Sequence, residues 1–220
     1  MTKRLLFCGW FFFMGFFCQA QTDSLSTKYR EDQFFLSFSL QLQQENFNGL
    51  KQNGFSNNFQ IGFVRDFPIN EQGTFALGLG IGYGYNRLVS NLQLDGKNDN
   101  TIAIAENNLK NLQTFSSLVF PVSIRLRTSS FSKTDFWRLY GGLKYKLHFS
   151  PKFKPFYGST FQNANIRNNN TSVFLSMGYN KWNLCVEYDL NSIYTNQTLL
   201  PSGAMAEIKN LKLGLIFYFL

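Results

Sequence analysis

The sequence has few of the residues that build disulfides and metal centres. It contains three cysteines and one histidine in 220 residues. Two of the cysteines, Cys8 and Cys18, fall near the N-terminus, which leaves Cys185 and His148 in the rest of the chain. A single cysteine forms no intrachain disulfide, and a single histidine supplies no multi-histidine metal site. We therefore expect no disulfide framework, no metal site and no cofactor.

Long apolar runs are missing after the first 20 residues. Those residues have Lys3 and Arg4 ahead of an apolar run at 5–17 and a small-residue site ending at Ala20, a pattern typical of a cleaved export signal. A retained membrane anchor is one alternative, but a spanning helix needs about 20 apolar residues. Lipid attachment at Cys18 is another, although the residue before it is not small. We expect a signal peptide at 1–20, a short periplasmic N-terminal segment at 21–32 and a single domain at 33–220.

The charge balance is modestly basic. The net charge of +8 falls to +6 once the signal is removed, because the signal contains two basic and no acidic residues. A basic protein can bind nucleic acid or an anionic surface. The basic residues are scattered along the chain and form no helical stripe, so we do not expect a nucleic-acid partner.

What the mature chain does have is alternation between large apolar residues and small or polar ones. The stretch FALGLGIGYGY at 75–85 shows it most clearly, with glycine or alanine at every second position. Eight such segments have about the 9 to 11 residues of a tilted membrane strand. They span residues 33–43, 58–67, 75–85, 116–127, 136–149, 171–179, 182–191 and 211–220.

The connections between these segments are alternately long and short. The long ones lie near 44–57, 87–112, 150–170 and 191–206, and the short ones near 68–74, 128–135 and 179–181. This order and the even strand count predict an all-β fold, an eight-stranded antiparallel up-and-down transmembrane β-barrel. We expect an integral protein of the cell outer membrane with long external loops and with its N- and C-termini in the periplasm.

A soluble barrel with its apolar face around a ligand would also show alternation. The apolar faces here, however, are almost free of charge, with Arg65 near a strand end as the exception. Aromatic residues also lie near the strand ends, where a membrane barrel has its interfacial girdle. We expect this lipid-facing girdle to contain Tyr83, Tyr85, Trp137, Phe149, Trp182 and Phe219.

The opposite faces of the segments carry the charged residues. Eight strands enclose a lumen only wide enough for side chains, which disfavours a general pore. We expect a structural network of ion pairs there, with an ion or proton path as the alternative. The expected network contains Arg125, Arg138, Lys144, Lys146, Glu187, Asp189 and Lys212. A proline inside a strand removes a ladder hydrogen bond, so Pro121 predicts a bulge or irregularity.

The sequence offers little for catalysis. His148 beside Ser150 is the sole candidate for a base and nucleophile, and adjacency in sequence does not provide the geometry of a triad. We expect no catalytic residues. Lys152, Lys154 and Arg167 lie where an external loop could contact phosphates of lipopolysaccharide. The expected partners are outer-membrane lipid, lipopolysaccharide and other envelope proteins.

Four stretches resemble the PorT-like family of small outer-membrane β-barrels. They are VFPVSIRLR, FWRLYGGLKYKLHFSPK, VEYDLNSIYTN and NLKLGLIFYFL. Two positions depart from the family pattern: Val119 stands where an acidic residue is usual, and Leu220 follows the terminal aromatic. The resemblance implies an integral outer-membrane protein, and for the founding branch an accessory part in type IX secretion and gliding motility.

The leading hypothesis is therefore a non-enzymatic outer-membrane barrel with a structural or accessory role in the cell envelope. A narrow channel for ions or small solutes is the alternative. An outer-membrane lipid-modifying enzyme is a third and weaker hypothesis.

Overall fold

The structure is a computed structural model that describes residues 31–94, 101–105, 109–128 and 137–219. The signal peptide predicted at 1–20 lies outside these residues. Among the described residues, no helix has the length and apolar character needed to cross a membrane.

Eight long strands form the fold within the described residues. They are β1 (Gln33–Glu45), β2 (Asn57–Pro68), β3 (Phe75–Ser90), β6 (Asn111–Arg127), β7 (Trp137–Lys154), β9 (Asn169–Tyr179), β10 (Trp182–Asp189) and β11 (Ile208–Phe219). Three short strands lie in the connections of the same region: β4 (Leu92–Leu94), β5 (Ile102–Ile104) and β8 (Phe161–Gln162).

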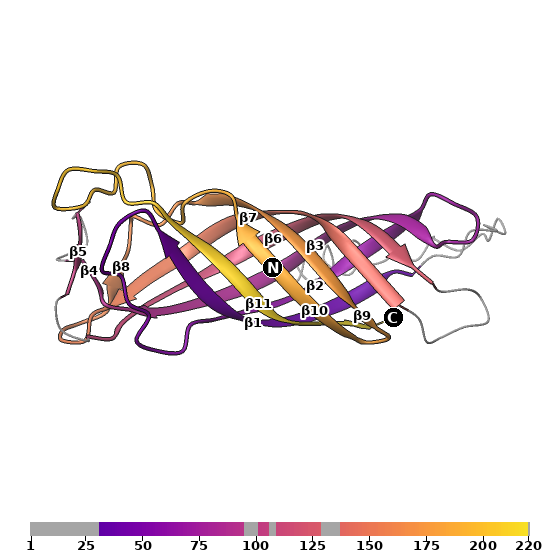
Figure 1. Ribbon diagram of the computed structural model, residues 1–220, viewed down its shortest axis with the longest axis horizontal. Helices are drawn as coiled ribbons and strands as arrows, with labels where there is room; N and C mark the ends of the chain where they lie inside the picture. Colours follow the sequence, from indigo (N-terminus) through magenta and orange to yellow (C-terminus); the bar gives the residue numbers. More distant parts are fainter. Residues whose placement is uncertain (1–30, 95–100, 106–108, 129–136, 220) are drawn as a thin grey trace, which may run out of the picture.

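The long strands pair in chain order and close into a barrel (Figure 1). Each neighbouring pair is antiparallel, and β1 pairs with β11 from Phe34–Phe219 to Glu45–Ile208. Closure matters because a sheet edge in lipid would leave backbone groups without hydrogen-bond partners. The prediction of an eight-stranded antiparallel barrel is confirmed.

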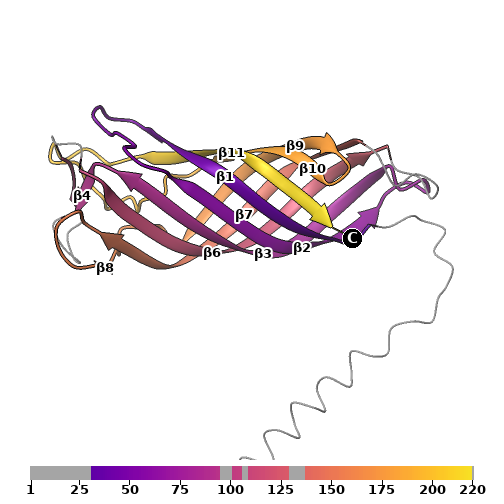
Figure 2. The same ribbon diagram turned by 90° about the horizontal axis from the view of Figure 1, so that it is seen from below.

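Long and short connections lie at opposite ends of the barrel (Figure 2). We call the end with the connections 46–56, 91–110, 155–168 and 190–207 the loop end, and the end with 69–74, 128–136 and 180–181 the turn end. The predicted alternation of connection lengths agrees with this arrangement. Strands β3, β6 and β7 each extend five residues further toward the loop end than the sequence pattern predicts.

The outer wall between the two ends is an apolar belt. Along each strand, large apolar side chains point outward and alternate with buried ones. Examples are Phe38 (46% exposed), Leu143 (49%), Leu175 (53%) and Leu184 (67%). A soluble barrel would bury these residues, whereas a lipid-facing wall exposes them. The orientation of the strands therefore excludes the soluble alternative.

The glycine face of β3 lines the lumen and makes room for side chains from other strands. A Cβ added to Gly78 would lie 2.7 Å from Cδ of Arg125, and one added to Gly82 would lie 2.9 Å from Cζ of Phe35. A methyl group at either position would therefore force its neighbours to shift. The alternation in FALGLGIGYGY thus provides a lipid face on one side and space for an arginine and a phenylalanine on the other.

Pro121 interrupts the ladder of pairs between β3 and β6 without changing the register of the two strands. The β3–β6 pairing is absent between Leu79–Val122 and Gly82–Val119, and the register is the same on both sides of the gap. The register shift lies elsewhere, in the β6–β7 pairing between Thr114 and Ser116. The expected irregularity at the proline is therefore a gap in the ladder, and the bulge belongs to a different site.

Above the belt, toward the loop end, three strands have apolar side chains that face inward and not outward. Leu88, Phe115 and Phe153, from β3, β6 and β7, point inward and are 1–2% exposed. They join residues of the connections in an apolar cap at the loop end. The buried residues of the cap are Leu88, Leu92, Leu94, Ile102, Phe115, Phe153, Ile166, Ile193, Tyr194, Ala206 and Ile208.

Candidate functional site

The lumen below the cap contains a cluster of three lysines and two carboxylates, which we call the lysine cluster. Its members are Lys144, Lys146, Glu187, Asp189 and Lys212, all 1–3% exposed. Glu187 is at the centre: its Oε2 lies 2.7 Å from Nζ of Lys144, and its Oε1 lies 2.9 Å from Nζ of Lys146 and 2.8 Å from Nζ of Lys212. Lys146 also pairs with Asp189.

Uncharged side chains complete the lysine cluster. Gln60 accepts a hydrogen bond from Lys144 at 2.9 Å and donates one to Glu187 at 3.1 Å. Asn210 donates to Asp189 at 3.0 Å. Buried charges are tolerable only when ion pairs and hydrogen bonds replace the lost water. Glu187 on β10 therefore connects to side chains of β2, β7 and β11, so that four strands are linked inside the lumen.

A second group of charges, the arginine cluster, lies at the turn end. Its members are Arg125, Arg127, Arg138, Asp66 and Glu31, all buried. Asp66 accepts from Arg125 at 2.6 Å and lies 2.6 Å from Arg127, while Glu31 lies 3.3 Å from Arg127 and 3.7 Å from Arg138. The sequence predicted one network, but the structure separates Arg125 and Arg138 from the lysines.

An apolar layer, the middle layer, separates the two clusters. It contains Phe35, Val64, Tyr140, Phe174, Cys185, Ile216 and Tyr218. The guanidinium of Arg125 lies 4.1 Å from the centroid of the Tyr140 ring, which is cation–π geometry. A cavity of about 10 Å³ lies between Arg125 and Lys144, and this is at the lower limit of what one water needs. The lumen is therefore packed across its section at this level.

His148 makes its contacts with the neighbouring strand β6 and not with Ser150. Its Nδ1 lies 2.8 Å from Oγ of Ser117, and its ring packs edge-on against Phe115 at 4.8 Å. Ser150 is exposed and has a φ of 51°. The Ser117–His148 pair is buried beneath the apolar cap. This geometry does not bring the predicted candidate residues together.

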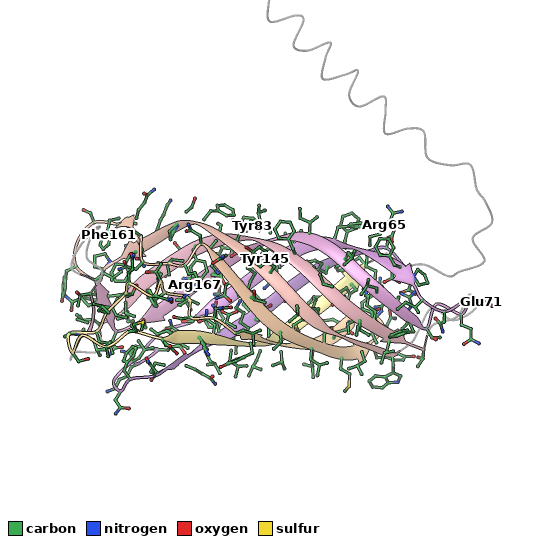
Figure 3. All side chains as sticks on the ribbon, turned by 90° about the horizontal axis from the view of Figure 1, so that it is seen from above. Arg65, Glu71, Tyr83, Tyr145, Phe161 and Arg167 are labelled. Atoms are coloured by element: carbon green, nitrogen blue, oxygen red, sulfur yellow. The ribbon has the colours of Figure 1, made fainter. Side chains whose placement is uncertain are left out.

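The six aromatic residues predicted for the girdle all point outward, with exposed fractions of 39–65%. Toward the turn end, Trp137 packs on Tyr179 and Trp182 on Phe217, with ring centroids 5.6 and 4.7 Å apart. Arg65 projects outward near the end that carries Glu71, whereas Phe161 lies at the opposite end (Figure 3). The role of the six aromatic residues at the lipid interface stays a prediction.

Described residues at the loop end border open hollows, two of which are large. The larger, about 390 Å³, is bordered by Pro155, Phe156, Tyr157 and Phe161 together with polar residues such as Gln93. The other, about 290 Å³, lies between the 190–207 connection and Arg167. Tyr157 is 78% exposed. The loop end thus offers shaped, partly aromatic surface, in contrast to the filled lumen.

Two residues of the arginine cluster, Asp66 and Glu31, were not among those predicted for the lumen. Asp66 alternates with Val64, Gly62 and Gln60 on the inward face of β2, and this alternation was a usable signal. Glu31 had no such signal, because it precedes β1 in the segment assigned to the periplasm. In the described ranges, no group of three or more His, Cys, Asp or Glu residues is arranged to hold a metal ion.

The chain is similar to one protein family and to solved structures of another protein. Residues 19–200 match the family described as "Outer membrane protein beta-barrel domain". No curated protein matches the chain. Two crystal structures of Ail, the attachment invasion locus protein of Yersinia pestis, are similar over 86% of this chain. One covers 97% of the Ail chain at 11% identity with a TM-score of 0.42. The other, in complex with the heparin analogue sucrose octasulfate, covers 99% of the Ail chain at 10% identity with a TM-score of 0.43.

The family match covers most of the chain and agrees with the closed barrel and its apolar belt. The chain belongs to the outer membrane protein beta-barrel domain family and is an integral protein of the outer membrane.

Proposed function

We propose that the protein is a non-enzymatic barrel with a structural or accessory role in the cell envelope, and that it acts through its loop end. The observation that carries this proposal is the filling of the lumen. From the turn end upward, the arginine cluster, the middle layer, the lysine cluster and the apolar cap follow one another inside the wall. A barrel filled in this way provides a rigid anchor and no passage for solutes.

The same filling argues against a narrow channel. An ion crossing the lumen would have to separate Glu187 from three lysines and displace the apolar middle layer. Both steps are costly, because the buried charges lose their partners and the middle layer leaves little space for water to replace them. Planar-bilayer recording of the purified barrel tests this point: we expect silence, and discrete conductance steps would support the channel instead.

We place the loop end outside the cell and both termini in the periplasm. Long loops on the outside and short turns in the periplasm are the usual arrangement of bacterial outer-membrane barrels. Protease added to intact cells should then cut within 46–56, 155–168 or 190–207 and leave the 180–181 turn uncut. Cleavage in the opposite pattern would reverse the orientation.

A non-enzymatic role fits the position of Ser117 and His148. A nucleophile and its base must reach a substrate, and this pair lies in the wall beneath the apolar cap with Asn86 donating to Ser117 at 3.1 Å. We assign the pair to packing of the wall. Replacing His148 with alanine should leave any lipid hydrolysis by the purified protein unchanged, and loss of such activity would contradict this assignment.

We further propose an accessory part in type IX protein secretion or gliding. The support is the resemblance of four stretches to the PorT-like branch. Deletion of the gene followed by comparison of exported proteins and of surface spreading tests it. Reduced export with intact outer membrane is the expected result, and unaltered export and spreading would remove this role while leaving the structural one.

A further inference from the structure

We propose that Arg87, Thr114 and Lys152 form a binding row for the phosphate groups of a glycolipid in the outer leaflet. These residues point outward from the adjacent strands β3, β6 and β7, directly above the apolar belt. The proposal rests on the proposed orientation, in which the loop end faces outward. It specifies which wall of the barrel, among several, makes the lipid contact.

The strand register places these residues side by side. Arg87 is opposite Thr114 in the β3–β6 pairing, and Thr114 is opposite Lys152 in the β6–β7 pairing. Adjacent strands lie about 4.8 Å apart, so the two cationic residues start about 10 Å from each other with a hydroxyl between them. Side chains as long as arginine and lysine can converge over that span on one phosphate. Asn57 and Gln162 continue the row on either side.

The row just below it on the same wall is aromatic. Tyr85 is opposite Phe59 on β2 and Ser116 on β6, and Ser116 is opposite Phe149 on β7. The hydroxyl groups of Tyr83 and Ser116 lie 2.7 Å apart. Aromatic residues mark the boundary between the hydrocarbon and the headgroups. The cationic row therefore lies where lipid phosphates are found.

A β-bulge is what turns Lys152 outward. Between the pairs Ser116–Phe149 and Thr114–Lys152, β7 contains one residue more than β6. Ser150 lies in this interval with a φ of 51°, in the left-handed region. Without the extra residue, strict alternation after Phe149 would point Lys152 into the lumen. With it, Phe153 enters the apolar cap, while Lys152 and Lys154 are exposed. Bulges re-aim side chains in this manner.

The cations of this wall are not neutralised within the described part of the chain. Neither Arg87 nor Lys152 forms a salt bridge with a described residue, although Arg87 donates a hydrogen bond to the carbonyl of Phe55. The wall on the other side of the barrel differs. There Lys209 of β11 pairs with Gln44 of β1, whose neighbour in the chain is Glu45, and the row contains no second cation. The row on the β3–β6–β7 wall therefore brings two outward cations together, and the row of Lys209 contains one.

The test uses the full-length mature barrel in neutral detergent, titrated with diphosphoryl lipid A or with dephosphorylated lipid A. A lysine or arginine near an anionic lipid surface contributes about fivefold in affinity. Arg87→Ala combined with Lys152→Ala should therefore weaken binding of diphosphoryl lipid A about 25-fold. The unmodified barrel should bind dephosphorylated lipid A about as weakly as the double variant binds the phosphorylated form.

Lys209→Ala is the matched control, since it removes one outward cation at the loop end of the opposite wall. It should change binding by less than about twofold, because Lys209 has no second cation in its row to share a phosphate and a lone cation is a weaker site than the pair. Heat-dependent electrophoretic mobility shows that each variant is folded. Equal binding of the two lipids, unchanged binding by the double variant, or an equal loss in Lys209→Ala would overturn the proposal. Because detergent has no inside or outside, this result is independent of the protease test of orientation.

Discussion

The belt and the loop-end section of β3, β6 and β7 have opposite patterns on the same strands. In the belt, Leu79, Val122 and Leu143 face outward and are 41–49% exposed. A few residues further on, Leu88, Phe115 and Phe153 face inward and are 1–2% exposed. The difference follows from the surroundings, because lipid accepts apolar side chains on the outside and water does not.

The two interiors are stabilised differently as a result. In the belt, the lumen contains polar residues that need partners, and the two charge clusters supply them. In the loop-end section, the interior is an apolar core of the kind found in soluble proteins. Loss of one charge should therefore be most damaging in the belt, whereas loss of one polar contact should be mild in the cap.

The largest expected effect is from Glu187→Ala. It removes the carboxylate that three lysines share, and breaking a buried ion pair costs about 3–5 kcal/mol. Urea unfolding of the barrel in lipid vesicles measures the change in the free energy of unfolding. Glu207→Ala is the control, because Glu207 is exposed at the loop end and should be neutral. Equal stability of the two variants would show that the lysine cluster contributes little.

Leu143→Arg tests the lipid side of the comparison. Leu143 lies halfway between Trp137 and Phe149 on β7 and is 49% exposed. An arginine on the lipid face near the midplane costs about 2–4 kcal/mol. Thr114→Arg places the same residue in the loop-end section, where a cost below about 1 kcal/mol is expected. If the two substitutions proved equally costly in vesicle unfolding, the boundary between the sections would be wrong.

Gly78→Ala should have an intermediate effect. The added methyl group would lie 2.7 Å from Arg125 Cδ and 2.7 Å from Ser123 Oγ, and overpacking of this kind costs about 1–3 kcal/mol. Gly84→Ala is matched to it on the same strand, with its nearest contact at 3.4 Å. Refolding yield and unfolding midpoint of the two variants give the measurement. A loss for Gly84→Ala as large as for Gly78→Ala would argue against close packing around Arg125.

The smallest expected effect is from Tyr194→Phe in the cap. Burial raises the pKa of the Tyr194 hydroxyl above its ordinary value, so this group remains a hydrogen-bond donor, and it donates to Gln113 at 2.8 Å. Its loss should cost about 1 kcal/mol. Amide hydrogen exchange should rise in the 190–207 connection and stay unchanged in the belt. Faster exchange throughout the barrel would mean that the cap and the belt unfold as one unit.

Much of the fold could be predicted because lipid imposes a strict period of two on the outer wall. Each of the eight predicted segments corresponds to an observed strand. The strand ends were less predictable: β7 was expected to end at Phe149 and ends at Lys154. Beyond the aromatic residues the apolar side chains face inward and the polar ones outward. A strand with this pattern has no apolar outer face, so it resembles a loop in a search for lipid-facing strands.

The lumen could be predicted in kind but not in arrangement. Alternation indicates that Arg125 and Lys144 both face inward, but it does not give their distance along the barrel axis. That distance depends on the stagger between neighbouring strands, which is fixed when the barrel closes. The stagger places Glu31 and Asp66 with the arginines, and leaves Glu187 and Asp189 with the lysines.

The sequence by itself determined the class of the protein, since alternation, strand length and connection length all follow from crossing a membrane as strands. Tertiary structure alone decided the layers inside the barrel, the cap, and the outward turn of Lys152. The physical reason is that periodicity describes one strand at a time. Register, closure and a single bulge at Ser150 are relations between strands.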